Sequence, residues 1–135
     1  MYLLDTDTLS NLMKRVPAEN LVVRLARVAP EEQFTSSVTL GELLYGAYRS
    51  ENSAALLDRI GAVIPTELPV LSFDAAAAGQ YGRIRAELES RGTPIGDADV
   101  RIAAIALTHG LRVVTGNVRH FRLVPGLEVE NWLEA

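Results

Sequence analysis

Five oxygen-bearing side chains lie at the edges of apolar runs in widely separated parts of the chain. They are Asp5, Glu42, Asp97, Asp99 and Asn117. Carboxylates that are drawn together repel one another and raise each other's pKa unless a cation is present. Carboxylate and amide oxygens are also the ligands of hard divalent cations. If the fold brings these side chains together, they predict a divalent-metal site.

The strongest single signal is Asp5-Thr6-Asp7, which follows the apolar run 2–4. Carboxylates at strand ends in α/β folds usually bind phosphates or metals. The alternative is a pair of turn-forming aspartates. Haloacid-dehalogenase-like phosphatases and response-regulator receivers also use an early strand-end aspartate, but they need a lysine in the carboxyl half. The only lysine here is Lys14, which excludes both.

The other candidates each have a competing structural role. Two residues apart on a helix, Asp97 and Asp99 diverge by roughly 200°, so we expect Asp99 to face the site and Asp97 to cap the helix. Glu42 lies three residues after Thr39, the spacing of a capping box. Asn117 in Thr-Gly-Asn-Val is also a natural turn residue.

The two histidines differ in what they suggest. His109, before Gly110, is typical of a helix C-terminus and is assigned no chemistry. His120 can contact a phosphate or act as an acid, with a surface role as the alternative.

Composition limits the remaining possibilities. With 48% hydrophobic and 22% charged residues, the 135-residue chain is typical of one globular domain spanning 1–135. The absence of cysteine excludes disulfides, thiol catalysis and zinc–thiolate sites. No apolar run is long enough to cross a membrane and no secretory signal is evident, so we expect a cytoplasmic protein.

The net charge of −4 argues against broad phosphate binding, although it leaves room for a local basic rim of arginines.

Strands and helices are predicted to alternate. The predicted strands are 2–5, 33–37, 68–73, 112–115 and 127–130. The predicted helices are a short one capped by Thr8, 19–28, one capped by Thr39, 52–64, one from Asp74 to about residue 90, and 100–107. This order predicts a three-layer α/β/α domain around a mainly parallel sheet of about five strands.

Ligands of such sheets bind beyond the carboxyl ends of the strands. Asp5 and Asn117 follow strands, whereas Glu42 and Asp99 lie in the first turns of helices, where free amides and the helix dipole favour acids. We therefore expect all four side chains at one edge of the sheet.

Several motifs, taken in order, resemble those of the PIN-domain ribonucleases, and most closely the VapC toxins of toxin–antitoxin pairs. They are Leu-Leu-Asp-Thr at 3–6, Ser-Ser-Val-Thr-Leu-Gly-Glu-Leu-Leu-Tyr-Gly at 36–46, Asp-Val-Arg-Ile-Ala-Ala at 99–104 and Val-Thr-Gly-Asn-Val-Arg-His-Phe at 114–121. The resemblance covers essentially the whole chain.

The resemblance implies metal-binding acids at Asp5, Glu42 and Asp99, with Asp5 and Asp99 as direct ligands. Thr6 matches a hydroxyl residue that supports the first acid, and Asn117 matches a polar or acidic position after the fourth strand. Relatives often carry a further acid near Asn117 or His120. The absence of this acid argues against a second tightly bound metal ion more than it argues against catalysis. Magnesium commonly uses only one or two protein carboxylates and completes its shell with waters.

Asp7 and Asp97 are secondary, supporting candidates. The resemblance further implies a Mg²⁺- or Mn²⁺-dependent endoribonuclease in which Glu42 orients or deprotonates the attacking water. The implied substrate is RNA, with transfer RNA as one candidate, and the implied partners are a VapB-type antitoxin and a second copy of the chain.

Arg49, Arg119 and His120 are the expected RNA contacts. Two other functions stay open: a PIN-like module that binds RNA or protein without cleaving, and, more remotely, a magnesium-dependent phosphatase or flap-type DNA nuclease.

Overall fold

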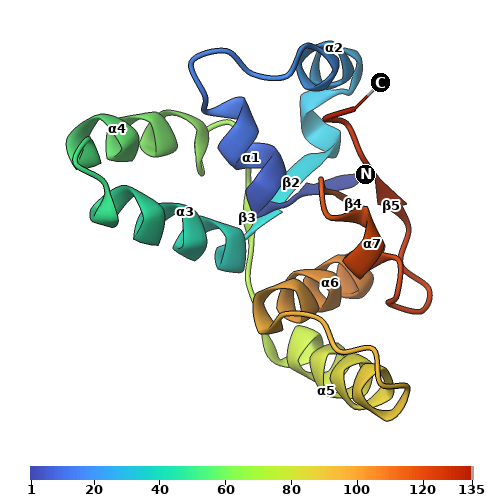
Figure 1. Cartoon of the computed structure of the whole chain (residues 1–135). Helices are drawn as coiled ribbons and strands as arrows, with labels where there is room; N and C mark the ends of the chain where they lie inside the picture. The colour runs from blue at the N-terminus through green and yellow to red at the C-terminus, as the bar shows by residue number, and fades with distance from the viewer. Residues whose placement is uncertain (135) are drawn as a thin grey trace.

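A five-stranded, wholly parallel sheet forms the centre of the computed structural model, which describes residues 1–134 (Figure 1). The strands are β1 (Tyr2–Leu4), β2 (Gln33–Ser36), β3 (Val70–Leu71), β4 (Arg112–Val114) and β5 (Val129–Glu130). Their order across the sheet is β3-β2-β1-β4-β5, and every neighbouring pair is parallel. The predicted α/β class with about five parallel strands is confirmed.

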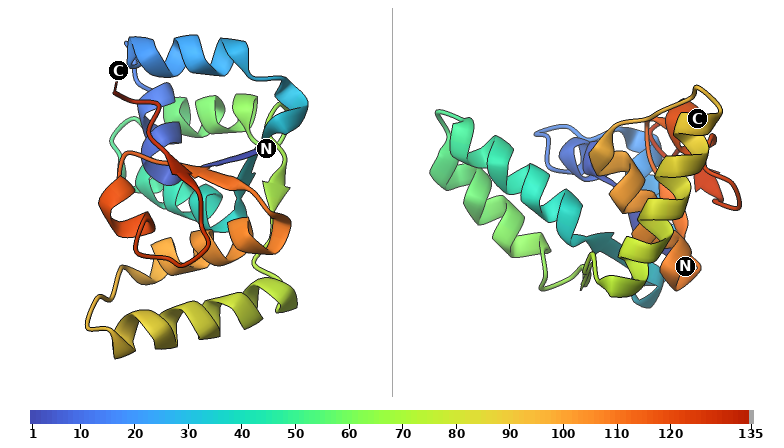
Figure 2. Two further views of the ribbon diagram at one scale, coloured as in Figure 1. Left: turned by 90° about the vertical axis from the view of Figure 1, so that its right-hand side faces the viewer. Right: turned by 90° about the horizontal axis from the view of Figure 1, so that it is seen from below.

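Helices cover both faces of this sheet (Figures 1 and 2). They are α1 (Thr6–Leu12), α2 (Glu19–Arg27), α3 (Ser37–Arg49), α4 (Ser53–Val63), α5 (Ala75–Ser90), α6 (Asp97–His109) and α7 (Val118–Phe121), with a 3₁₀ turn at Pro30–Glu32. Within residues 1–134, none of the helices combines the length and the apolar character needed to span a membrane.

The sheet is covered by an apolar core on each face, which explains why the strand sequences are unbroken apolar runs. Leu3 and Val113 pack into a core with α5 and α6, whereas their neighbours Leu4 and Val114 pack into a second core with α1 to α4. Successive side chains of a strand point to opposite faces. Both faces of the two central strands are therefore buried, as the three-layer arrangement requires.

Two predicted caps are wrong, and both errors have the same cause. Asp5, rather than Thr8, caps α1: its Oδ1 accepts a hydrogen bond of 2.9 Å from the Thr8 amide. Ser36, rather than Thr39, caps α3, because its Oγ accepts from the Thr39 amide at 3.0 Å. Each helix begins directly after its strand, three residues earlier than predicted. The predicted cap Asp74 of α5 is confirmed.

The chain segment after β5 is anchored by Trp132, which is fully buried. Its ring meets Tyr2 edge-on at 4.9 Å between centroids, and the Arg24 guanidinium lies 5.0 Å from its centre. The indole nitrogen donates to Glu130 at 3.1 Å. These contacts hold the segment after β5 against Tyr2 of the central strand β1 and Arg24 of α2.

Replacing Trp132 with alanine removes this anchor, and we expect it to lower the free energy of unfolding by about 3–5 kcal/mol. Urea denaturation monitored by circular dichroism measures the change. Val16→Ala, at a side chain that is 81% exposed, is the matched control and should change stability by less than about 0.5 kcal/mol. Equal effects of the two substitutions would contradict a packed role for Trp132.

Candidate active site

Asp5 is the most buried acid of the carboxyl edge of the sheet. It directly follows the central strand β1, and only 3% of it is exposed. Burial raises its pKa to about 6, since the charged carboxylate is poorly solvated there. Hydrogen bonds from Thr115 and Thr8 oppose this rise, and the negative charge of Asp7 adds to it.

A hydroxyl contact joins the second acid to the same edge. Thr6, the first residue of α1, donates to Glu42 Oε1 of α3 at 2.6 Å, and its hydroxyl lies 3.2 Å from that of Thr39. Because Ser36 caps α3, Glu42 is the sixth residue of the helix and takes no part in a capping box. The Thr6 hydroxyl bonds only one oxygen of the Glu42 carboxylate. The carboxylate is exposed, and its second oxygen takes no part in this contact.

Asp99 and Asp97 lie on opposite sides of the first turn of α6. Asp99 is partly buried, and its pKa is raised by burial first and then by the charge of Glu42, with a smaller contribution from Asp7. Glu42 and Asp7 are thus near enough for their charges to act on Asp99, although the three acids come from three different helices.

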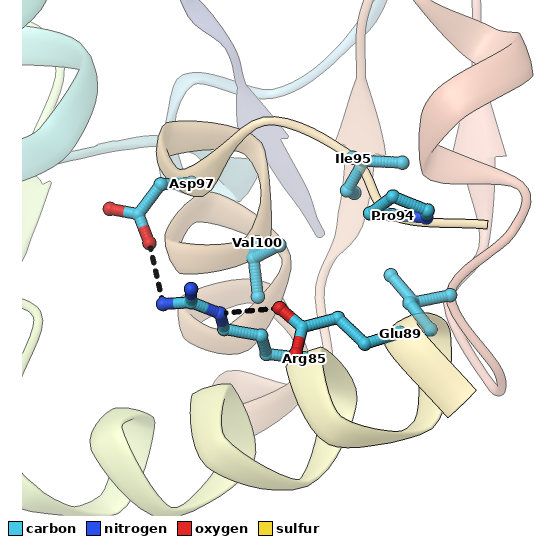
Figure 3. A pocket seen from close by; sticks show the side chains of 7 residues that line it. Arg85, Glu89, Pro94, Ile95, Asp97 and Val100 are labelled. Atoms are coloured by element: carbon cyan, nitrogen blue, oxygen red, sulfur yellow. Dashed lines mark hydrogen bonds and ion pairs between the residues drawn. The ribbon is translucent and has the colours of Figure 1, made fainter. Parts of the chain in front are cut away.

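Asp97 turns toward α5 instead. Tyr81 and Arg101 donate hydrogen bonds to it and hold its pKa below the ordinary value, and Arg85 lies 3.8 Å away. Figure 3 shows the carboxylate directed toward Arg85, beside a small pocket of about 250 Å³ between α5 and α6. The cap of α6 is Gly96, so the predicted capping role of Asp97 is wrong. Asp97 is not among the converging acids.

Asn117 connects Asp99 to His120. Its Nδ2 donates to Asp99 Oδ2 at 3.4 Å and lies 2.8 Å from His120 Nδ1, which itself is 3.8 Å from Asp99. Its backbone amide donates to the Thr115 hydroxyl at 2.8 Å. Asn117 therefore links the loop after β4 to the first turn of α6.

Thr115 is the polar contributor that the sequence did not reveal. It is fully buried, and it contacts both Asp5 and the backbone of Asn117. The only indication in the sequence was that a hydroxyl residue ends the apolar run 113–115. From the end of β4, this hydroxyl reaches both Asp5, which follows the neighbouring strand β1, and the Asn117 amide.

The two arginines predicted as RNA contacts are both exposed. Arg49 is exposed at the end of α3, stacked on Tyr45, and Arg119 is exposed on α7. Neither forms an ion pair with the converging carboxylates in the described residues.

Comparison with known proteins identifies the architecture that carries these side chains. Residues 2–127 match the family described as PIN domain. The chain belongs to the PIN-domain family. It is 40% identical over 131 residues to the tRNA(fMet)-specific endonuclease VapC of Salmonella typhimurium, with 97% of each chain covered. It is 37% identical over 136 residues to Ribonuclease VapC2 of Haemophilus influenzae, with 98% of each chain covered.

Solved structures place the fold in the same group. Superposition on DNA-bound VapBC from Salmonella typhimurium gives a TM-score of 0.90 at 40% identity, covering 97% of both chains. The FitAcB structure from Neisseria gonorrhoeae gives 0.91 at 29% identity, with both chains fully covered. The three-layer α/β/α PIN fold is thus confirmed.

The donor set of this PIN domain consists of oxygens, which suits Mg²⁺ or Mn²⁺. Across residues 1–134, no three His, Cys, Asp or Glu side chains are gathered tightly enough to form a ready-made metal cage. Such a looser set fits an ion that takes one or two carboxylates and completes its shell with water and substrate. Burial is the main reason that the pKa values of Asp5 and Asp99 are raised, and the nearby negative charges of Asp7 and Glu42 add to it; a cation would offset that negative charge.

Asp5→Asn should stabilise the metal-free protein at neutral pH while keeping the helix cap, which asparagine can also form. Folded Asp5 holds its proton up to about pH 6, whereas the unfolded carboxyl loses it near 3.8. The wild type therefore loses stability as pH rises from about 4 to 6, and the asparagine variant avoids this loss, which amounts to about 3 kcal/mol.

Urea denaturation in EDTA at pH 4, 5, 6 and 7 measures the difference. Asp58→Asn, at an exposed position on α4, is the matched control. An asparagine variant that is less stable than wild type at pH 7, or a difference that does not vary with pH, would contradict the assignment.

Proposed function

We propose that this chain is a divalent-metal-dependent endoribonuclease and the toxin of a VapBC-type toxin–antitoxin pair, folded as one domain over residues 1–135. The observation that supports the proposal is the placement of Asp5 at the end of the central strand of a PIN fold, with the adjacent Thr6 bonded to Glu42 at 2.6 Å and the charges of Glu42 and Asp7 acting on Asp99. The names of its relatives support RNA as the substrate, and one of them supports transfer RNA.

Asp5 and Asp99 are the proposed ligands of Mg²⁺ or Mn²⁺, with Asn117 holding Asp99 in place. Such a cation would polarise the phosphodiester and stabilise charge that develops on its oxygens. Asp7 adds negative charge close to both ligands.

Glu42 is the proposed group that orients or deprotonates the attacking water. Thr6 fixes one of its oxygens at 2.6 Å, which leaves the other available to the water. In-line attack of this water on phosphorus breaks the bond to the 3′ oxygen. The products are a 5′-phosphate and a 3′-hydroxyl.

The proposed protein partner is a VapB-type antitoxin that blocks the site. Support comes from the related structures, which include VapBC from Salmonella typhimurium and VapBC2 from Rickettsia felis, each bound to DNA. A homodimer is proposed from the same resemblance.

Substitution of the acids should abolish cleavage without unfolding the protein. Incubation of antitoxin-free protein with total RNA and Mg²⁺ or Mn²⁺ should give fragments with 5′-phosphates. Asp5→Ala, Asp99→Asn and Glu42→Gln should each lower the rate at least about 100-fold, the lower range for loss of a positioned proton-transfer group. EDTA should stop the reaction.

Asp97→Asn is the matched control, because Asp97 is two residues from Asp99 in the same first turn but faces α5, and it should retain nearly full activity. Cleavage that survives EDTA or both Asp5→Ala and Asp99→Asn would exclude this mechanism. Well-folded protein that binds RNA without cutting it would instead favour the binding module.

Metal affinity should depend on pH, because a cation must displace the proton that burial retains on Asp5. We expect Mn²⁺ affinity, measured by isothermal titration calorimetry, to fall by about tenfold per unit below pH 6 as protons and metal compete for the carboxylate. Asp5→Asn should bind Mn²⁺ more weakly and lose most of this dependence. Affinity that is constant from pH 5 to 7.5 would contradict a role for Asp5 as ligand.

A further inference from the structure

Helix α3 carries two large aromatic side chains that are exposed to solvent. Tyr45 is 63% exposed and Tyr48 is 70% exposed. The helix pairs with α4 in a hairpin that projects from the body of the molecule, as the view from below in Figure 2 shows. Aromatic rings that are exposed beside a charged groove can stack on the bases of a single-stranded nucleic acid.

Tyr45 is held by Arg49, one turn further along α3. The guanidinium carbon lies 5.3 Å from the centre of the Tyr45 ring, and Arg49 Nη1 donates to the phenol oxygen at 3.3 Å. A cation over an aromatic face is attracted by the ring and restricts its rotation. The ring is thus oriented by Arg49 while most of it stays accessible.

The Tyr45–Arg49 pair lies on the helix face that carries Glu42. Residues 42, 45 and 49 are spaced by three and four, which aligns them along one side of a helix. Tyr45 lies about 4.5 Å further along the axis than Glu42. Tyr48 is turned by about 120° from Glu42, although by only about 60° from Tyr45.

A groove of about 370 Å³ lies between α1, α3 and α4, and Glu42 is at its border with the Tyr45 side of α3. Thr6, Glu42 and several apolar side chains line it, while Lys14 and Arg59 bring positive charge from α1 and α4. Tyr45 is outside this groove, about one helical turn along α3 from Glu42. A strand of nucleic acid at Glu42 would therefore have cations for its phosphates on one side and, at Tyr45, a ring for a base on the other. Single-stranded nucleic acids are bound by this combination of positive charge and stacking rings.

We propose that Tyr45, backed by Arg49, is the stacking platform for the base next to the cleaved phosphodiester. This assignment rests on the proposed endoribonuclease function. A base that stacks on Tyr45 must be unpaired where it meets the ring.

Binding of short RNA tests the platform directly. In an Asp99→Asn background, the affinity for fluorescein-labelled oligoadenosine decamers is measured by anisotropy, with one nucleotide at a time made abasic. Tyr45→Ala should weaken binding by about 5- to 100-fold, the range for loss of one base–aromatic stack. Tyr45→Phe, which keeps the ring, and Tyr48→Ala, which removes the neighbouring exposed ring, should stay within about twofold of the parent.

One abasic position should weaken binding to the parent and have no further effect on Tyr45→Ala, because both changes remove the same contact. The stacking role of Tyr45 would be overturned if Tyr45→Ala bound RNA with unchanged affinity. It would also be overturned if every abasic nucleotide weakened binding equally in the parent and in Tyr45→Ala. Light scattering on the same samples must show an unchanged oligomeric state. A dimer that dissociates in Tyr45→Ala would assign the ring to a contact between copies and also overturn the proposal.

Cleavage by protein with an intact Asp99 separates this proposal from the proposed function. If the wild type cuts the decamer with Mg²⁺ and Tyr45→Ala cuts it with the same KM, only the platform fails. If the wild type cuts no RNA under any metal condition, the endoribonuclease function itself fails.

Discussion

The burial of one carboxylate at the end of the central strand is the constraint on which the rest of this molecule depends. Asp5 follows β1, whose side chains are covered on both faces, so its carboxylate is almost completely withdrawn from bulk water. The Thr8 amide and the Thr115 hydroxyl supply hydrogen bonds, but they do not offset desolvation, and the pKa stays near 6. A nearby cation would remove the conflict, which is the physical argument for a metal at this position.

Short connections bring the other groups to Asp5. α1 begins directly after β1 and its cap, and α3 begins directly after β2, so Thr6 and Glu42 are placed by strand ends rather than by flexible loops. The first turn of α6 contributes Asp99, and the loop after β4 contributes Asn117, whose amide reaches Asp99. Side chains from distant parts of the sequence therefore meet because parallel strands end at one edge.

Much of this arrangement follows from the sequence, and the failures are local. Unbroken apolar runs such as 2–4 predicted buried parallel strands. Helical spacing predicted that Asp97 and Asp99 would diverge, and the apolar segment directly after Asp99 decided which of them to assign to the site. The caps at Thr8 and Thr39 were wrong because a residue three positions earlier also has a capping side chain, and the strand end decides between them. Thr115 was missed because its partners, Asp5 and Asn117, are joined to it only by the tertiary fold.

Site-specific carbon-13 NMR titration of the Asp5 carboxyl tests the central claim most directly. The account predicts a pKa of about 6 in metal-free protein. It also predicts that saturating Mg²⁺ lowers this pKa below the ordinary value of about 4 for aspartate, since the cation favours the charged form. A pKa near 4 without metal, or a value near 6 that Mg²⁺ leaves unchanged, would contradict it.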